Sequence, residues 1–530
     1  MDLREKRVAG GDVYGYCPPM SYAFSGKNIN LSFIGGESAV LEFSEAPERE
    51  LSAGGNKYTY YCTKAEDDVY LISFADGNTG TAIALDFTKG LAVRATVSRT
   101  DPPAVSFGGI GGAPADAPGF SNDLDGSVVE WVFGGNKKDT VHVEYTVKSA
   151  LVKLLDQEDG VDIVSFNAVR VTDQSFLQIA EFQSGGAVNT TVLLSNFAPI
   201  SSVGVVFASR NEVGITAKWI GAYGRIKNST GTFDLNSIGE GYTRSIDQYC
   251  QPRCFELAGE TFELVMDDGY DMTLHFISGT ELEWQFVNGE VNKDSYECRK
   301  SDDTTYLVSF NAGGVEPRVN YVYVIDKENW LVTKLTAAIG KNPRYPYLIK
   351  PEFVFGAIRR DGAEVKLYPR HGFTSDVMGN VVQWVYACEL STIHVYYCTD
   401  FYRITYPRDP TFSKEAEQTN DVFMAMLASL PSSDEPTHYV KIKDGMYLIS
   451  LTESNCERLI GPQMGARSDT LCFLDNFKRG YNVGRGFGTM TPPAGGDVPI
   501  HCMIGAYGTI IEPMDEALKK MVTDPNPYII

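Results

Sequence analysis

The stretch VYLISF at residues 69–74 sets the pattern of this chain, because it recurs with small changes in three other places. The other copies are VDIVSF (161–166), TYLVSF (305–310) and MYLISL (446–451). A short run of β-branched and aromatic residues without helical periodicity is typical of a buried β-strand. We therefore expect four copies of one β-rich unit.

Longer matches arrange these copies as a pair that is itself repeated. A Gly-Ala or Gly-Gly motif ends each unit, as VSFGGIGG (105–112), WIGAYGRI (219–226), FVFGAIRR (353–360) and MIGAYGTI (503–510). The first and third units share FSGKNINLSF (24–33) and LAGETFELVM (257–266), and the second and fourth share FSNDLDGSVVEWVF (120–133) and FTSDVMGNVVQWVY (373–386). The repeat predicts four domains in the order A-B-A′-B′, at residues 1–117, 118–245, 246–370 and 371–530.

The fourth unit carries extra residues. Gly126 and Gly379 are 253 residues apart, whereas Asp162 and Tyr447 are 285 apart, which indicates about 32 additional residues that we place at 406–438. Within them Phe423, Leu427 and Leu430 recur at helical spacing. We expect a short amphipathic helix there, either over the mouth of a barrel or on the surface.

Each unit consists of short strand-like runs separated by Gly, Asn and Asp. About eight runs in a block of this size predict an all-β, up-and-down antiparallel barrel, which closes its own edges and can enclose one small ligand. The predicted architecture is therefore a tandem array of four lipocalin-like barrels.

Composition narrows the classes of partner. The formal net charge is −22, from 68 acidic and 46 basic residues, which disfavours nucleic acid and anionic membrane surfaces as partners. No apolar run reaches membrane-spanning length, and residues 1–19 lack the pattern of a signal peptide. Ten cysteines in such a chain indicate reduced thiols, so we expect a cytoplasmic protein.

The pair of units resembles the MoaF family, the molybdenum-cofactor-biosynthesis F-like proteins of the calycin superfamily. The resemblance is carried by LAGETFEL, TYLVSF, VYVIDKENWLV, FVFGAIRRDG, FTSDVMGNVVQWVY, IHVYY and MYLISL within 254–511, and residues 20–245 resemble a second, diverged copy. The family's Glu-His-hydrophobic-Tyr strand is matched by His394 and Tyr396, with Ile393 in place of the Glu. The resemblance implies lipocalin-like barrels, and calycins include both decarboxylases and ligand carriers.

The strand IHVYY (393–397) supplies the first candidate site. Alternation places His394 and Tyr396 on one face, which we expect to be the lumen, where an imidazole and a phenol can exchange protons with a ligand. By the 252-residue spacing to His394, the first-half counterparts are His142 and Glu144. A structural histidine inside a barrel is the alternative.

Residues around this strand complete the candidate set. Tyr386, Tyr402 and Arg403 flank it, and an arginine there could hold a carboxylate, although a solvated arginine at a hairpin end is the alternative. Trp384 is expected in the core or the cavity wall. Tyr507 could close the lumen or fill it.

No pattern for a metal or cofactor was found. Cys250 and Cys254 form a single CxxxC without a second pair, and the histidines lack ligand spacing, so we expect neither metal nor cofactor. The sequence therefore favours a cofactor-independent enzyme of the lyase or isomerase/cyclase type that acts on a hydrophobic or aromatic small molecule. A carrier that binds such a molecule without changing it is the alternative, and a purely structural barrel array is a third reading.

Overall fold

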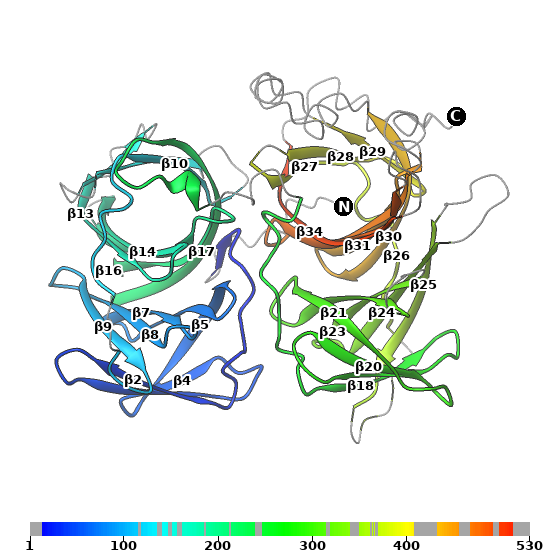
Figure 1. Cartoon of the computed structure of the whole chain (residues 1–530), viewed down its shortest axis with the longest axis horizontal. Coiled ribbons are helices and arrows are strands. Elements are labelled where there is room, and N and C mark those ends of the chain that lie inside the picture. Colours follow the sequence, from blue (N-terminus) through cyan, green and yellow to red (C-terminus); the bar gives the residue numbers. More distant parts are fainter. Residues whose placement is uncertain are drawn as a thin grey trace. The chain divides into compact units, whose positions relative to one another are not determined.

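The computed structural model describes residues 13–114, 118–134, 140–146, 151–155, 162–184, 187–210, 214–238, 246–313, 319–339, 349–360, 363, 365, 369–388, 390–406, 432–454, 467–490 and 498–511. The elements with described bounds are 34 strands and the 3-10 turn η4 (Leu235–Ser237). The chain divides into two units, one within Val8–Thr243 and one within Arg244–Ile530. Each unit contains two barrels (Figure 1), which confirms the prediction of an all-β array of four.

Barrel A is a closed ring of antiparallel strands in chain order. Its strands are β2 (Asn28–Phe33), β3 (Ser38–Phe43), β4 (Glu50–Ala53), β5 (Asn56–Glu66), β6 (Val69–Ala75), β7 (Thr79–Asp86), β8 (Leu91–Ser98) and β9 (Ala104–Ile110). The ring closes where Leu31 of β2 pairs with Ile110 of β9. The VYLISF stretch is β6.

Barrel B follows with one extra strand. Its strands are β10 (Ser127–Val132), β11 (Thr140–Thr146), β12 (Leu151–Leu155), β13 (Asp162–Arg170), β14 (Ser175–Ser184), β15 (Ala187–Asn196), β16 (Ser201–Arg210) and β17 (Gly214–Ser229). β1 (Val13–Gly15) pairs in parallel with β17. Between β12 and β13 no ladder is present in the described residues, although Cα atoms of the two strands approach within 8 Å.

Barrels A′ and B′ repeat this design. The strands of A′ are β18 (Thr261–Met266), β19 (Met272–Phe276), β20 (Glu281–Phe286), β21 (Asn292–Lys300), β22 (Thr305–Ala312), β23 (Val319–Asp326), β24 (Leu331–Ile339) and β25 (Ile349–Ile358). Those of B′ are β27 (Asn380–Ala387), β28 (Leu390–Tyr396), β29 (Phe401–Thr405), β30 (Ser433–Lys443), β31 (Met446–Thr452), β32 (Arg467–Asn476), β33 (Tyr481–Met490) and β34 (Val498–Ile510), with β26 (Gly372–Phe373) added to β30. The pairing of β30 with β31 closes B′ into a ring.

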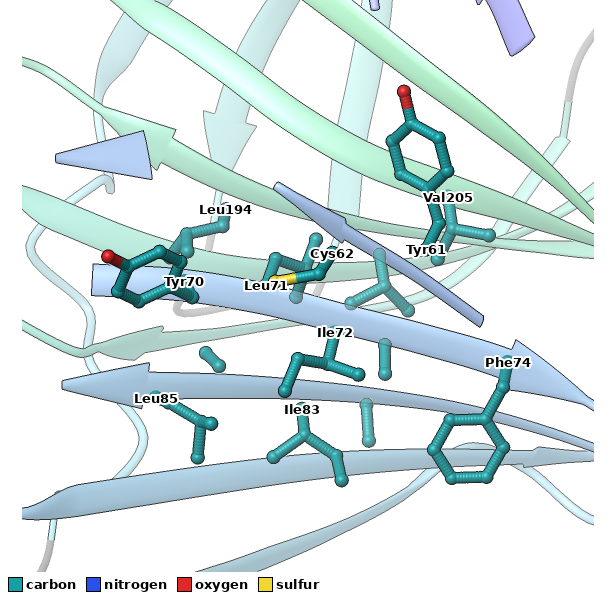
Figure 2. Packing of buried hydrophobic residues seen from close by; sticks show 14 of the residues in the cluster. Tyr61, Cys62, Tyr70, Leu71, Ile72, Phe74, Ile83, Leu85, Leu194 and Val205 are labelled. Atoms are coloured by element: carbon teal, nitrogen blue, oxygen red, sulfur yellow. The ribbon is translucent and has the colours of Figure 1, made fainter. Parts of the chain in front are cut away.

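The two barrels of each unit share an apolar wall. In β6, alternate residues point to opposite faces, so Ile72 belongs to the interior of A, while Leu71 contacts barrel B. Figure 2 shows Leu71 on the side of β6 that faces Leu194 and Val205 of barrel B. In the second unit, the outer faces of A′ and B′ form an equivalent cluster. Strands of these walls are therefore buried on both faces.

The structure corrects one part of the predicted repeat. VDIVSF does not have the position of MYLISL in its barrel, because its residues 162–166 lie in β13, one strand too early. The true counterpart of β31 is β14: Ser175 pairs with Asn196 at the end of β15, as Met446 pairs with Asn476 at the end of β32. The insertion is accordingly shorter than predicted, and its last residues, from Ser433 on, belong to β30. The predicted helix at 423–430 lies outside the described residues.

Candidate functional site

The candidate site lies inside barrel B′, on the inner face of β28. His394 pairs with Val382 of β27, and Thr392 pairs with Trp384. Directly opposed residues share a face of the sheet, and Val382, Trp384 and Tyr396 belong to one buried cluster inside this barrel. His394 and Tyr396 therefore share the inner face, as alternation along the strand predicted.

His394 is a neutral, fully enclosed imidazole. Its side chain lies among the rings of Tyr402, Tyr396 and Phe473, with 5.0 Å between the ring centres of His394 and Tyr402. Its Nε2 is 3.0 Å from Oγ1 of Thr392, which fixes the ring by a hydrogen bond. Burial lowers the pKa of His394 to about 3, so the ring is uncharged at neutral pH and is a weak base.

Tyr396 belongs to a chain of buried hydrogen bonds. Nε1 of Trp384 donates to the Tyr396 hydroxyl at 3.2 Å, and that hydroxyl donates to Oδ2 of Asp475 at 3.2 Å. Nδ2 of Asn482 donates to the other carboxyl oxygen of Asp475 at 3.1 Å. Burial raises the pKa of Asp475 to about 8, although the hydrogen bonds from Asn482 and Tyr396 oppose this, so the carboxyl group is largely protonated at neutral pH.

Tyr402 carries a hydroxyl group that the described residues leave unsatisfied. Its side chain is 1% exposed, and its hydroxyl makes no hydrogen bond in the described part of the chain. Burial raises the pKa of Tyr402, and the carboxylates of Glu453 and Glu435 raise it further, so the phenol remains a neutral donor. A buried hydroxyl without a partner is costly, and a ligand oxygen would satisfy it.

Barrel B has a different residue at the position of His394, and the predicted equivalence of His142 with His394 is wrong. Trp131 donates to the Tyr145 hydroxyl at 3.0 Å, just as Trp384 donates to Tyr396, so Tyr145 is the counterpart of Tyr396. The counterpart of His394 is then Val143. The hairpin after β10 is longer by two residues than the hairpin after β27, which moves β11 one residue out of the predicted register and reverses its faces.

His142 and Glu144 therefore lie on the outer face of β11. His142 pairs with Glu130 of β10, and its Nε2 is 2.7 Å from a carboxyl oxygen of that residue. Glu144 shares this face by alternation. The structure does not bring either residue into the interior of barrel B.

Arg403 is not a ligand-binding residue of the lumen. It pairs with Val395 on the outer face of the barrel, next to the inward Tyr402. Its Nε and Nη2 donate to the two carboxyl oxygens of Asp434 at 2.9 and 3.3 Å. The arginine is thus held in a buried ion pair, and the prediction that it binds a substrate carboxylate is not supported by its position.

Tyr507 also points outward, contrary to the expectation that it closes the lumen. It pairs with Val385 of β27, which is an outer residue between the inward Trp384 and Tyr386. Its ring packs 5.8 Å from that of Tyr249, outside the barrel. The motif around it has a different role: Gly508 pairs with Trp384, and a Cβ at Gly508 would lie 2.4 Å from the indole ring.

Sequence patterns missed the acidic members of the site. Asp475 and Glu435 are buried at 1% and 0% exposure, and both lie on the inner face through their pairing with Tyr447 and Tyr402. Asp475 precedes Asn476 and a turn, so it was indistinguishable from a turn residue. The alternation of inner and outer residues along β32, aligned with that along β31, is the signal that could have identified it. No group of residues able to hold a metal ion is present in the described ranges.

Comparisons with known proteins give one family match. Residues 233–341, which include most of barrel A′, match the MoaF N-terminal domain. No curated protein matches the chain. Among solved structures, a crystal structure of a candidate beta-lactamase from Burkholderia vietnamiensis is similar over 19% of this chain and 93% of its own, with 16% identity and a TM-score of 0.16, which supports no functional argument. Among the described residues, no helix has the length and apolar character needed to span a membrane.

Proposed function

We propose that barrel B′ captures a small hydrophobic or aromatic molecule and catalyses a proton transfer on it without a cofactor, as a lyase or an isomerase/cyclase. The observation that carries the proposal is the buried Tyr402 hydroxyl without a hydrogen bond, next to the neutral imidazole of His394. In the same proposal, the chain is a tandem MoaF-like protein of the calycin type, and the cytoplasm is its location.

The two side chains have complementary roles in this chemistry. The phenol of Tyr402 donates a hydrogen bond to a ligand oxygen and stabilises the negative charge that develops there. The imidazole of His394, whose pKa is lowered to about 3 by burial, accepts a proton only when the acidity of the ligand is raised by that hydrogen bond. Aromatic rings of Tyr386, Tyr396 and Phe473 supply an apolar surface for the ligand.

A carrier that binds the same class of ligand without chemistry is the second candidate. The strongly lowered pKa of His394 and the raised pKa of Tyr402 favour a carrier. With these pKa values, neither side chain gains or loses a proton in the physiological pH range. In a carrier, Tyr402 would serve only to orient the ligand.

Binding is tested with the neutral fluorescent probe N-phenyl-1-naphthylamine. We expect Tyr402→Phe and His394→Val to weaken binding, while His142→Val, a change of the outward histidine, leaves it unchanged. Equal binding by all four proteins would place the ligand elsewhere.

Chemistry is tested separately by deuterium exchange. An enolisable aromatic ketone, 1-phenyl-2-propanone, is incubated with the protein in deuterium oxide and followed by proton NMR. If the protein is an enzyme, we expect deuterium exchange to be faster than in buffer alone. This acceleration should be lost in His394→Val. A ketone that binds but exchanges at the buffer rate supports the carrier.

A further inference from the structure

A concave site lies in the second unit, where barrel A′ meets barrel B′. It is a cleft of about 620 Å³, which is within the range of small-molecule sites. Strand β21 contributes half of its lining residues, β22 contributes Asn311 and β34 contributes His501. Its polar lining residues with hydroxyl, amide or imidazole groups are Thr280, Ser295, Asn311 and His501. None of these belongs to the lumen of B′, so the cleft is independent of the proposed function.

The first unit shows that this cleft is not a necessary result of packing two barrels. There, Tyr61 of β5 pairs with Ser73 of β6, as Glu297 of β21 pairs with Ser309 of β22. Tyr61 stacks on Trp219 of barrel B with 4.8 Å between ring centres, and Nε1 of Trp219 donates to Oγ of Ser73 at 2.7 Å.

Both rings of that stack are at most 5% exposed, so the position is filled in the first unit. In the second unit, Glu297 replaces the tyrosine, and Met503 replaces the tryptophan directly before the shared IGAYG motif. Two large rings are thus exchanged for smaller side chains at the place where the cleft opens.

Ser309, the counterpart of Ser73, forms a hydrogen bond with a histidine instead of a tryptophan. Oγ of Ser309 is 2.9 Å from Nε2 of His501 and accepts a hydrogen bond from Nδ2 of Asn320 at 3.1 Å. Burial lowers the pKa of His501 to about 4, and the charge of Arg485 lowers it further, so the imidazole is neutral. A neutral imidazole can exchange hydrogen bonds with hydroxyl groups but supplies no charge for an anion.

Both basic residues of the cleft form ion pairs. Arg253 pairs with Glu297 at 3.0 Å, and Lys293 pairs with Glu281 at 3.3 Å. Asp294 accepts a hydrogen bond from Nε1 of Trp284 at 2.8 Å. A charged ligand would have to compete with these pairs, whereas a neutral polar ligand would not.

Uncharged donors and acceptors remain for a ligand. Oδ1 of Asn311 accepts from Asn320 at 2.9 Å, which leaves the amide NH₂ of Asn311 as a donor. The hydroxyls of Thr280 and Ser295 lie among the lining residues, as do the rings of Phe255 and Tyr296. Several neutral hydrogen-bonding groups beside aromatic rings suit a molecule with polar edges and an apolar face.

We propose that this cleft binds a small, electrically neutral molecule with several hydroxyl groups, of the size of a mono- or disaccharide or a cyclitol. Hydroxyl groups of the ligand contact Asn311, His501 and the hydroxyls of Thr280 and Ser295, and a C–H face of the ligand packs on the aromatic rings. The filled equivalent in the first unit binds no such molecule.

The test uses the full chain and glucose, maltose and myo-inositol as probes, with binding followed by calorimetry and saturation-transfer NMR. Glucosamine and glucose 6-phosphate serve as charged analogues. We expect a neutral probe to bind more tightly than its charged analogues. Asn311→Leu should weaken binding about tenfold, the effect of one ligand hydrogen bond. The double variant Glu297→Tyr, Met503→Trp restores the first-unit residues and should abolish binding.

Several results would overturn this proposal. They are no binding of any neutral probe, tighter binding of a charged analogue, and unchanged binding in both variants. The thermal unfolding transition of each variant, compared with that of the wild type, reports whether the variant is folded. Should the double variant not fold, Asn311→Leu alone decides the question.

Discussion

The hydroxyl of Tyr396 donates a hydrogen bond to Oδ2 of Asp475 inside barrel B′, across 3.2 Å. In barrel B the same two positions are held by Tyr145 and Ser195, and Ser195 is bonded to Gln178 and Ser202 at 2.8 and 2.9 Å. One barrel of the pair-wise repeat thus encloses a carboxyl group where the other encloses a hydroxyl. The acid makes B′ sensitive to pH in a way that B is not.

The first prediction concerns the stability of Asp475→Asn. The folded-state pKa of Asp475, about 8, lies above its ordinary value of 3.8, so between these pH values the folded chain keeps a proton that the unfolded chain releases. The contribution of Asp475 to the stability of the wild type therefore falls as pH rises from about 4 to about 8. The variant lacks this loss, and we expect it to be more stable than the wild type by more than about 1 kcal/mol at pH 8. Urea unfolding at a series of pH values measures this difference. The same pH dependence of the free energy of unfolding in both proteins would contradict the prediction.

The second prediction concerns His394→Val, which installs the residue that barrel B has at this position. The folded-state pKa of His394, about 3, lies below its ordinary value of 6.5, so the unfolded chain binds a proton that the folded chain excludes. The contribution of the buried imidazole to the free energy of unfolding is therefore fully present above about pH 6.5, and it is lost as pH falls toward 3. The valine variant should lose less stability than the wild type between pH 6.5 and 4.

The matched control for that experiment is His142→Val. His142 is partly exposed and bonded to Glu130 on the outer face, so its replacement leaves the interior of the barrel unchanged. A loss of the wild-type acid response in the His142 variant, but not in the His394 variant, would refute the assignment of the buried histidine.

The third prediction concerns the IGAYG motif. An added Cβ at Gly508 would lie 2.4 Å from the indole of Trp384, so Gly508→Ala forces the ring to move. Overpacking of this kind costs about 1–3 kcal/mol. Gly372→Ala is the control, because no atom lies within 4 Å of a Cβ at that position. Thermal unfolding should separate the two variants, and equal midpoints would show that the barrel adapts without cost.

The fourth prediction concerns the buried pair of Arg403 and Asp434. Arg403→Met leaves the Asp434 carboxylate without its bidentate partner, and we expect a loss of about 3–5 kcal/mol. The double variant Arg403→Met, Asp434→Leu should recover a large part of that loss. Affinity for N-phenyl-1-naphthylamine in the folded double variant should equal that of the wild type, since Arg403 lies on the outer face. A large loss of affinity would indicate that Arg403 takes part in ligand binding after all.

The fold was predictable because its signals are local and repeated. Short β-branched and aromatic runs such as VYLISF define strands, and four copies of the Gly-Ala or Gly-Gly motif mark the closing strand of each barrel. What failed was the alignment between copies. VDIVSF resembles MYLISL in composition, yet its strand precedes the matching one, since apolar strands of the same barrel look alike.

The site was predictable only where one strand carried the information. His394 and Tyr396 are two residues apart, so their shared face follows from the period of a strand. Tyr402 and Arg403 are adjacent, and only one of them can face the interior, but their sequence does not say which. That choice depends on register with β28 and β30, which is a long-range property of the folded barrel.

The wall shared by the two barrels of each half has a consequence for how such a chain can arise. Because β6 of barrel A is covered on its inner face by Ile72 and on its outer face by contacts with Leu194, a gene fragment that encodes one barrel would yield a protein with a bare apolar sheet. Such a product would aggregate before selection could act on it. A fragment with one barrel is therefore at a disadvantage, because only the pair of barrels covers the apolar wall.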